Sequence, residues 1–246
     1  MKIKISALSD MGCVRKNNED MISINGVMLR DNSIDLETHL SEEETFSTLL
    51  ADGMGGHDYG EVASEYTLSQ ITNYLSEERF SIENIEDDLR IFVQNISVSL
   101  NKKAQEEHQT APMGCTLTGL LWLRDKVLLV NAGDSRTYRF RNGFLKQLSI
   151  DDTERELSGN TVDSKLLVNC IGGGCDGRLF VKDITENIHV GDKFSLCSDG
   201  LTDMVDDDRI EEVLANYDNP AEQLVNEAKE NGGYDNISVV TLMIKE

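Results

Sequence analysis

The sequence predicts an α+β fold built on antiparallel sheets. Long amphipathic helical segments are inserted between runs of strand-like segments, and this order is typical of layered α+β domains. The chain of 246 residues is long enough to bury a sizeable core, and 39% of its residues are hydrophobic, as in ordinary globular proteins. Because it contains no linker, repeat or low-complexity segment, we expect a single domain over residues 1–246.

The N-terminal half combines three strands with two helices. The predicted strands cover residues 2–8, 20–28 and 45–51. A glycine-rich turn follows the third strand, and residues 61–75 then predict a helix. Apolar side chains recur at intervals of three and four between Ile82 and Leu100, which predicts a second, longer helix ending near Gln105.

The C-terminal half is richer in strands. The predicted strands cover residues 116–123, 126–132, 137–141, 144–148, 179–184, 193–197 and 236–244. Asn142-Gly143 is a strong signal for a two-residue hairpin turn. Two short helices are predicted before the last strand, and the second begins with Asn219 as N-cap and Pro220 at its first position. Residues 149–177 are polar and glycine-rich, so we expect an irregular surface excursion there.

Four aspartates stand at the ends of predicted strands. Asp52 and Asp199 each follow an apolar run and precede a glycine, Asp134 follows a third run, and Asp235 precedes the last strand. A lone acid after a strand is usually a turn residue or a helix cap. Four together predict a cluster of oxygen ligands, which suits Mg²⁺ or Mn²⁺.

The composition narrows the possible partners. The net charge of −22 disfavours binding to nucleic acid and to anionic membranes. No apolar run approaches the ~18 residues of a membrane span, and the N-terminus lacks the apolar centre of a signal peptide. The five cysteines are odd in number and form no Cys-x-x-Cys pair, which disfavours a disulfide framework. We therefore expect a cytoplasmic protein.

Six short motifs occur in a fixed order along the chain. They are Gly12 to Arg15 with Asn18-Glu19-Asp20, Asp52 to His57 with Gly60 to Ser64, Gly114-Cys115-Thr116, Gly133-Asp134-Ser135-Arg136, Ser198 to Asp203, and Asp235-Asn236-Ile237-Ser238. In this order they resemble the metal-dependent Ser/Thr protein phosphatases of the PPM (type 2C) family, over roughly residues 5–244. The resemblance implies a four-layer α/β/β/α sandwich of two antiparallel sheets flanked by helix pairs, with metals at one edge.

The same resemblance implies a set of metal ligands. Asp52 matches the acid that bridges two Mn²⁺ or Mg²⁺ ions, and the carbonyl group of Gly53 matches a ligand of one of them. Asp199 and Asp235 match the acids that hold the second ion. Asp134, with Asp203 or Asp199, matches a weaker third-metal site, although Asp203 could instead cap the following helix.

Other matched positions surround these ligands. Glu19 and Asp20 match residues that bind or orient metal-bound water, and Asn236 is expected beside them. Arg15 matches an arginine that grips the phosphate, since a guanidinium group can bind two phosphate oxygens at once. His57 either orients substrate or water, or makes a structural hydrogen bond.

The resemblance predicts a compact bacterial phosphatase that hydrolyses phosphoserine or phosphothreonine on proteins. We expect a monomer that opposes a Ser/Thr kinase. Its segment 149–177 is shorter than the flap of many family members, so substrate choice stays open. Two alternatives remain: a catalytically inactive regulatory or phosphoprotein-binding module on the same fold, and a phosphatase for small phosphate esters or for one dedicated regulator protein.

Overall fold

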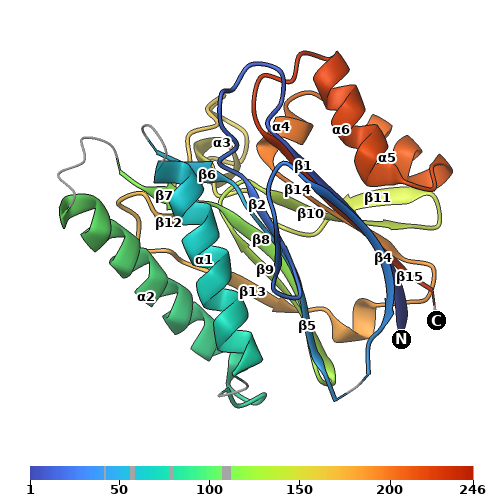
Figure 1. The fold of residues 1–246 in the computed structure, drawn as a ribbon, viewed down its shortest axis with the longest axis horizontal. Coiled ribbons are helices and arrows are strands. Elements are labelled where there is room, and N and C mark those ends of the chain that lie inside the picture. Colours follow the sequence, from blue (N-terminus) through green and yellow to red (C-terminus); the bar gives the residue numbers. More distant parts are fainter. Residues whose placement is uncertain (42, 56–58, 78–79, 107–111, 246) are drawn as a thin grey trace.

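The computed structural model describes residues 1–41, 43–55, 59–77, 80–106 and 112–245 (Figure 1). Two six-stranded antiparallel sheets face each other. In sheet A the strands, in spatial order, are β11 (Phe144–Gln147), β10 (Arg136–Arg141), β14 (Lys193–Cys197), β15 (Ile237–Ile244), β1 (Lys2–Asp10) and β4 (Ser33–His39). In sheet B they are β13 (Phe180–Asp183), β9 (Lys126–Ala132), β8 (Leu117–Leu123), β5 (Thr45–Ala51), β2 (Met21–Ile24) and β3 (Val27–Leu29). A small third sheet contains β12 (Ile171–Gly172), β7 (Gly114–Cys115) and β6 (Gly53–Met54).

Helices cover the outer face of each large sheet. The long helices α1 (Tyr59–Ser76) and α2 (Ile85–Glu106) lie against sheet B, and α5 (Asp207–Asn216) and α6 (Pro220–Glu230) lie against sheet A (Figure 1). Three shorter helical segments are α3 (Glu154–Leu157), η1 (Thr185–Asn187) and α4 (Asp199–Thr202).

Three apolar cores separate these four layers. One core fills the space between the two sheets, with residues such as Ile5 from sheet A and Leu50 from sheet B. A second lies between sheet B and its helices, and a third lies between sheet A and its helices. The predicted α+β class with two antiparallel sheets is therefore confirmed, and helix pairs flank both sheets.

Local signals explain several element boundaries. Asn142 and Gly143 both have positive φ angles, 53° and 85°, as the two-residue hairpin turn requires. Asn219 accepts a hydrogen bond from the backbone N–H of Glu222 at 3.5 Å, and Pro220 opens α6 as predicted.

Some elements differ from the sequence-based expectation. The strand expected over residues 20–28 is a hairpin of β2 and β3, because Asn25 and Gly26 adopt positive φ angles of 47° and 87°. The edge strand β4 was not predicted. The long helix begins at Ile85, so Ile82 precedes it. Residues 149–177, expected to be irregular, contain α3 and β12. Within the described residues, no helix is long and apolar enough to cross a membrane.

Candidate active site

The fold brings the predicted acids to one end of the two facing sheets. Asp52 directly follows β5, and Asp20 directly precedes β2, its neighbour in sheet B. In sheet A, Asp199 follows the end of β14 and Asp235 precedes the start of β15, its antiparallel neighbour. Asp134 follows β9, whose end pairs with the start of β8. Strand pairing therefore gathers carboxyl groups from five separate segments.

Asp20 is the most deeply buried of these acids. Its side chain is inaccessible to solvent, and Ser198 Oγ donates a hydrogen bond to its Oδ2 at 2.8 Å. Burial raises the pKa of Asp20 to about 7, hydrogen bonds from Ser198 and Ser238 oppose the rise, and the charge of Asp199 adds to it. Oδ1 of Asp20 has no hydrogen-bond partner among the described residues. A buried carboxylate oxygen without a donor is suited to a cation.

The backbone of Asp52 is held by Thr116, the residue directly before β8. Its backbone N–H donates to Thr116 Oγ1 at 2.9 Å, and its carbonyl oxygen accepts from the Thr116 N–H at 2.8 Å. Thr116 Oγ1 also shares a hydrogen bond with Ser135 Oγ at 2.6 Å. The Gly114-Cys115-Thr116 motif therefore fixes the backbone of Asp52. Sequence reasoning gave Thr116 no role, and its place in that motif was the signal.

Asp52 and Asp199 are buried carboxyl groups whose pKa values are raised by the acids around them. Burial raises the pKa of Asp52 well above its usual range, and the charges of Asp20, Asp199, Asp134 and Asp235 raise it further. Burial also raises the pKa of Asp199, and the charges of Asp235 and Asp203 raise it further, while Asp52 and the charge of Lys165 oppose the rise.

The glycines after Asp52 and Asp199 are required by close backbone packing. A Cβ atom on Gly53 would lie 2.1 Å from the carbonyl oxygen of Gly60, and one on Gly200 would lie 2.0 Å from that of Asn236. In the sequence, each of these glycines stands out only as the residue after an acid at the end of an apolar run. The structure adds that neighbouring backbone leaves no room for a side chain.

Asn236 anchors the loop that carries Arg15 and Glu19. Its Oδ1 accepts from the Glu19 backbone N–H at 2.8 Å, and its Nδ2 donates to the carbonyl oxygens of Met11 and Asn17 at 3.0 and 2.9 Å.

Arg15 lies at the rim of the carboxyl cluster. Its Nη2 donates to Asp235 Oδ2 at 2.5 Å, and the Arg15 side chain is half exposed. That hydrogen bond raises the pKa of Arg15, so the guanidinium keeps its charge.

Asp134 and Asp203 line a second part of the site. A cavity of about 40 Å³ lies there, bounded by Asp134, Arg136, Asp151, Thr153, Arg155, Lys165, Asp199, Thr202 and Asp203. Burial raises the pKa of Asp134 to about 7. Asp203 is exposed and forms an ion pair with Lys165. Lys165 was not among the site residues predicted from the sequence. The alternative role of Asp203 as a helix cap is wrong, because Asp206 caps α5 by accepting from the Arg209 N–H at 2.8 Å.

The donor set fits a divalent cation, because hard oxygen ligands and a partnerless buried carboxylate oxygen lie among carboxyl groups whose pKa values are raised. Within the described residues, no group of three or more His, Cys, Asp or Glu side chains is already arranged to hold a metal ion. Asp235 instead contacts Arg15, and Asp203 contacts Lys165. The expected role of His57 concerns a residue outside the described part of the chain.

Residues 29–231 match the sequence model of the family described as protein phosphatase 2C. The chain belongs to this family. The resemblance inferred from the motifs is thereby confirmed.

Relatives with a stated activity extend across almost the whole chain. The serine/threonine phosphatase Stp of Listeria monocytogenes is 29% identical over 94% of this chain and 92% of its own length. The serine/threonine protein phosphatase PstP of Mycobacterium tuberculosis is 31% identical over 97% of this chain. The matched region covers 44% of the length of PstP, which is the longer protein.

Solved structures share the fold. A serine/threonine phosphatase of S. agalactiae has a TM-score of 0.81 at 25% identity, covering 99% of this chain and 100% of that one. The catalytic domain of PstP, solved in complex with two manganese ions, has a TM-score of 0.75 at 29% identity, with both chains covered completely.

Proposed function

We propose that this protein is a metal-dependent serine/threonine protein phosphatase that hydrolyses phosphoserine and phosphothreonine. The observation that carries the proposal is the gathering of carboxyl groups from five segments, in which burial and neighbouring charges raise the pKa values of Asp20, Asp52, Asp134 and Asp199. Its family membership and its relatives, named as serine/threonine phosphatases, support the same activity.

We assign two divalent cations, Mn²⁺ or Mg²⁺, to the central acids. Asp52, Asp199 and Asp235 would supply carboxylate ligands, and Gly53 would supply its carbonyl oxygen. The manganese ions bound by the PstP catalytic domain support this assignment. When bound, such ions supply an acidified water as nucleophile and neutralise charge on the phosphoryl oxygens.

The surrounding residues position substrate and ligands. We assign Arg15 to the phosphate group, because its guanidinium is charged, half exposed and at the rim of the carboxyl cluster. Asn236 would fix the loop bearing Arg15 and Glu19, and buried Asp20 would orient water beside the ligands through its free Oδ1. We propose that Asp134, together with Asp199 or Asp203, would bind a third cation.

We also propose the domain organisation, oligomeric state, compartment and cellular role of this protein. Residues 1–246 would act as one catalytic domain, and residues 149–177 would form a short flap that influences substrate choice. We expect a monomeric, cytoplasmic enzyme that opposes a Ser/Thr kinase acting on the same proteins. Support for the compartment comes from the cysteines, all of which are free thiols in the structure.

The test is release of phosphate from a phosphothreonine peptide, measured with Mn²⁺ and with EDTA. Asp52→Asn keeps the shape of the side chain but removes its charge, so it should abolish release. Metal-dependent release that is lost in this variant supports the proposal. No release from folded protein in Mn²⁺ would favour the inactive regulatory module, and faster hydrolysis of small esters than of a phosphopeptide panel would favour the small-ester alternative.

A further inference from the structure

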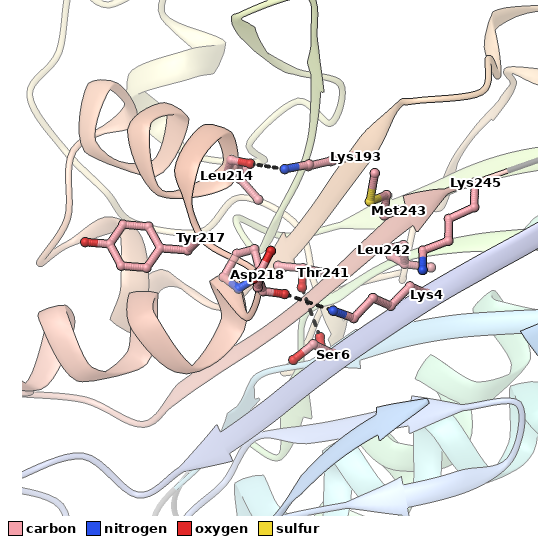
Figure 2. Close-up of a pocket in the computed structure, with 11 residues that line it drawn as sticks. Lys4, Ser6, Lys193, Leu214, Tyr217, Asp218, Thr241, Leu242, Met243 and Lys245 are labelled. Carbon is pink, nitrogen blue, oxygen red and sulfur yellow. Dashed lines mark hydrogen bonds between the residues drawn. The ribbon is translucent and has the colours of Figure 1, made fainter. Parts of the chain in front are cut away.

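A cavity of about 230 Å³ lies on sheet A (Figure 2). It lies where β14 begins and β15 ends, whereas the carboxyl cluster lies beyond the end of β14 and before the start of β15. Its walls come from β1, β14, β15 and the α5–α6 connection. They are formed by Lys4, Ser6, Lys193, Leu214, Tyr217, Asp218, Pro220, Thr241, Leu242, Met243 and Lys245. We propose that this cavity is a second binding site, which takes a small phosphorylated molecule.

The strand register places two lysines on one face of the sheet. Lys4 of β1 and Lys193 of β14 are both direct partners of Met243 in β15, so their side chains stand on the same side. Figure 2 shows both ammonium groups reaching toward the end of α5. Lys193 Nζ donates to the carbonyl oxygen of Leu214, and Lys4 Nζ donates to that of Asp218 at 3.1 Å.

These contacts leave donors for a ligand. An ammonium group carries three N–H donors, and each of these two lysines has one described hydrogen bond. Capping the end of α5 would explain one cation there. It does not explain two cations brought together beside a cavity, where burial lowers the pKa of Lys193, the charge of Asp218 opposes the fall, and the charge of Lys4 adds to it.

The local charge is opposite to that of the whole protein. The charged residues that line the cavity are Lys4, Lys193, Lys245 and Asp218, so the lining has a net charge of +2. Just outside, Glu37 pairs with both Lys2 and Lys245, so counting Lys2 and Glu37 as well still leaves two positive charges. The whole chain carries −22. A small dianion such as a phosphate monoester therefore fits the cavity electrostatically.

The remaining walls define the size and character of the ligand. Leu214, Pro220 and Met243 form an apolar lining, and Tyr217 stands at the edge. The volume lies below the ~300 Å³ at which pockets for drug-sized ligands begin. The cavity thus suits a phosphate group held by the lysines, with a small organic part against the apolar wall.

This cavity is separate from the carboxyl cluster. β14 runs from Lys193, in the cavity, to Cys197, two residues before Asp199, and at ~3.3 Å per residue this strand alone separates its two ends by ~13 Å. A small ligand in the cavity cannot reach the acids. The inference is therefore independent of the phosphatase activity proposed above.

The test is a residue-resolved NMR titration with methylphosphonate, a small dianion that a phosphatase cannot hydrolyse. Ionic strength is held constant with sodium chloride. We expect saturable shifts of the Ser6, Lys193 and Met243 amide signals, present with and without Mn²⁺. Shifts confined to the Asp52 end, or shifts at Lys193 that do not saturate, would overturn the inference.

Charge variants define the site further. Lys4→Gln together with Lys193→Gln should weaken binding at least tenfold, whereas Lys103→Gln on the exposed part of α2 should leave it unchanged. If the double variant fails to fold, Asp218→Asn provides the opposite test. Removing that negative charge should tighten binding about threefold or more. Unchanged affinity in Asp218→Asn, or equal weakening by Lys103→Gln, would refute a built site.

Discussion

Thr116 offers a sharp test of how this fold positions a proposed metal ligand. Its hydroxyl group accepts the backbone N–H of Asp52 at 2.9 Å and shares a hydrogen bond with Ser135 Oγ at 2.6 Å. Thr116→Val keeps the shape of the side chain but removes the oxygen. Both groups then lose a partner in a site where Thr116 itself is only 2% exposed.

The expected loss can be estimated from those two contacts. Leaving one buried polar group without a partner costs about 1–3 kcal/mol. Two groups lose a partner in Thr116→Val, so the variant should lower the free energy of unfolding by about 2–6 kcal/mol. Because Asp52 also loses its anchor, we expect kcat at saturating Mn²⁺ to fall ~100-fold, as for a misplacement of about 1 Å.

Thr118 in β8, two residues after Thr116, provides a control. It is also buried, and its Oγ1 shares a hydrogen bond with Thr137 Oγ1 at 2.8 Å. Thr118→Val leaves one buried group without a partner, so it should cost about 1–3 kcal/mol in urea titration, yet leave kcat and Mn²⁺ affinity near normal. Thr116→Ser should restore activity. If both valine variants lose activity equally, or if Thr116→Val stays fully active, Thr116 does not position Asp52.

Further perturbations test other parts of the site. Arg15→Ala should raise KM for a phosphopeptide more than it lowers kcat, and steady-state kinetics showing an unchanged KM would assign Arg15 a structural role. Gly200→Ala should cost about 3 kcal/mol or more in urea titration, because its Cβ would lie 2.0 Å from a carbonyl oxygen. Gly143→Ala, whose Cβ meets nothing within 4 Å but whose φ of 85° strains an alanine, should cost only about 1–2 kcal/mol, and equal losses would contradict the packing argument. In EDTA, the free energy of unfolding should fall as pH rises from about 4 to about 7. The pKa values of Asp20 and Asp134 are raised to about 7 in the folded protein, so it holds protons that the unfolded chain has already released. Asp20→Asn should flatten that profile in urea titrations at several pH values, and an unchanged slope would show that Asp20 does not titrate in this range.

Much of the fold could be predicted because its strongest patterns are local. The Asn142-Gly143 turn and the start of α6 depend on neighbouring residues, and the sequence displays both. Asn25-Gly26 carries the same hairpin signal, so the break between β2 and β3 was also predictable. Strand β4 was harder to see, because an edge strand with one face toward solvent contains only two apolar residues, Ile34 and Leu36.

The site was only partly predictable from sequence. The acids could be found because each stands at the end of an apolar strand. The groups that hold them could not, because their contacts join distant segments: Thr116 lies 64 residues from Asp52, and Lys165 lies 38 residues from Asp203. No local pattern around Lys165 indicates its partner. The pairing depends on how residues 149–177 fold back over the cluster.

The carboxyl cluster also links metal binding to folding. Two ion pairs offset part of its negative charge, the Arg15 guanidinium on Asp235 and the Lys165 ammonium on Asp203, while burial and mutual repulsion raise the pKa values of Asp52 and Asp199 and so favour their protonated forms. A divalent cation at the same carboxyl groups would favour their ionised forms and would compete with Arg15 for Asp235. Metal binding should therefore release protons. It should also free the guanidinium group that we assign to the phosphate, so one event would complete the metal ligands and make the substrate-binding residue available.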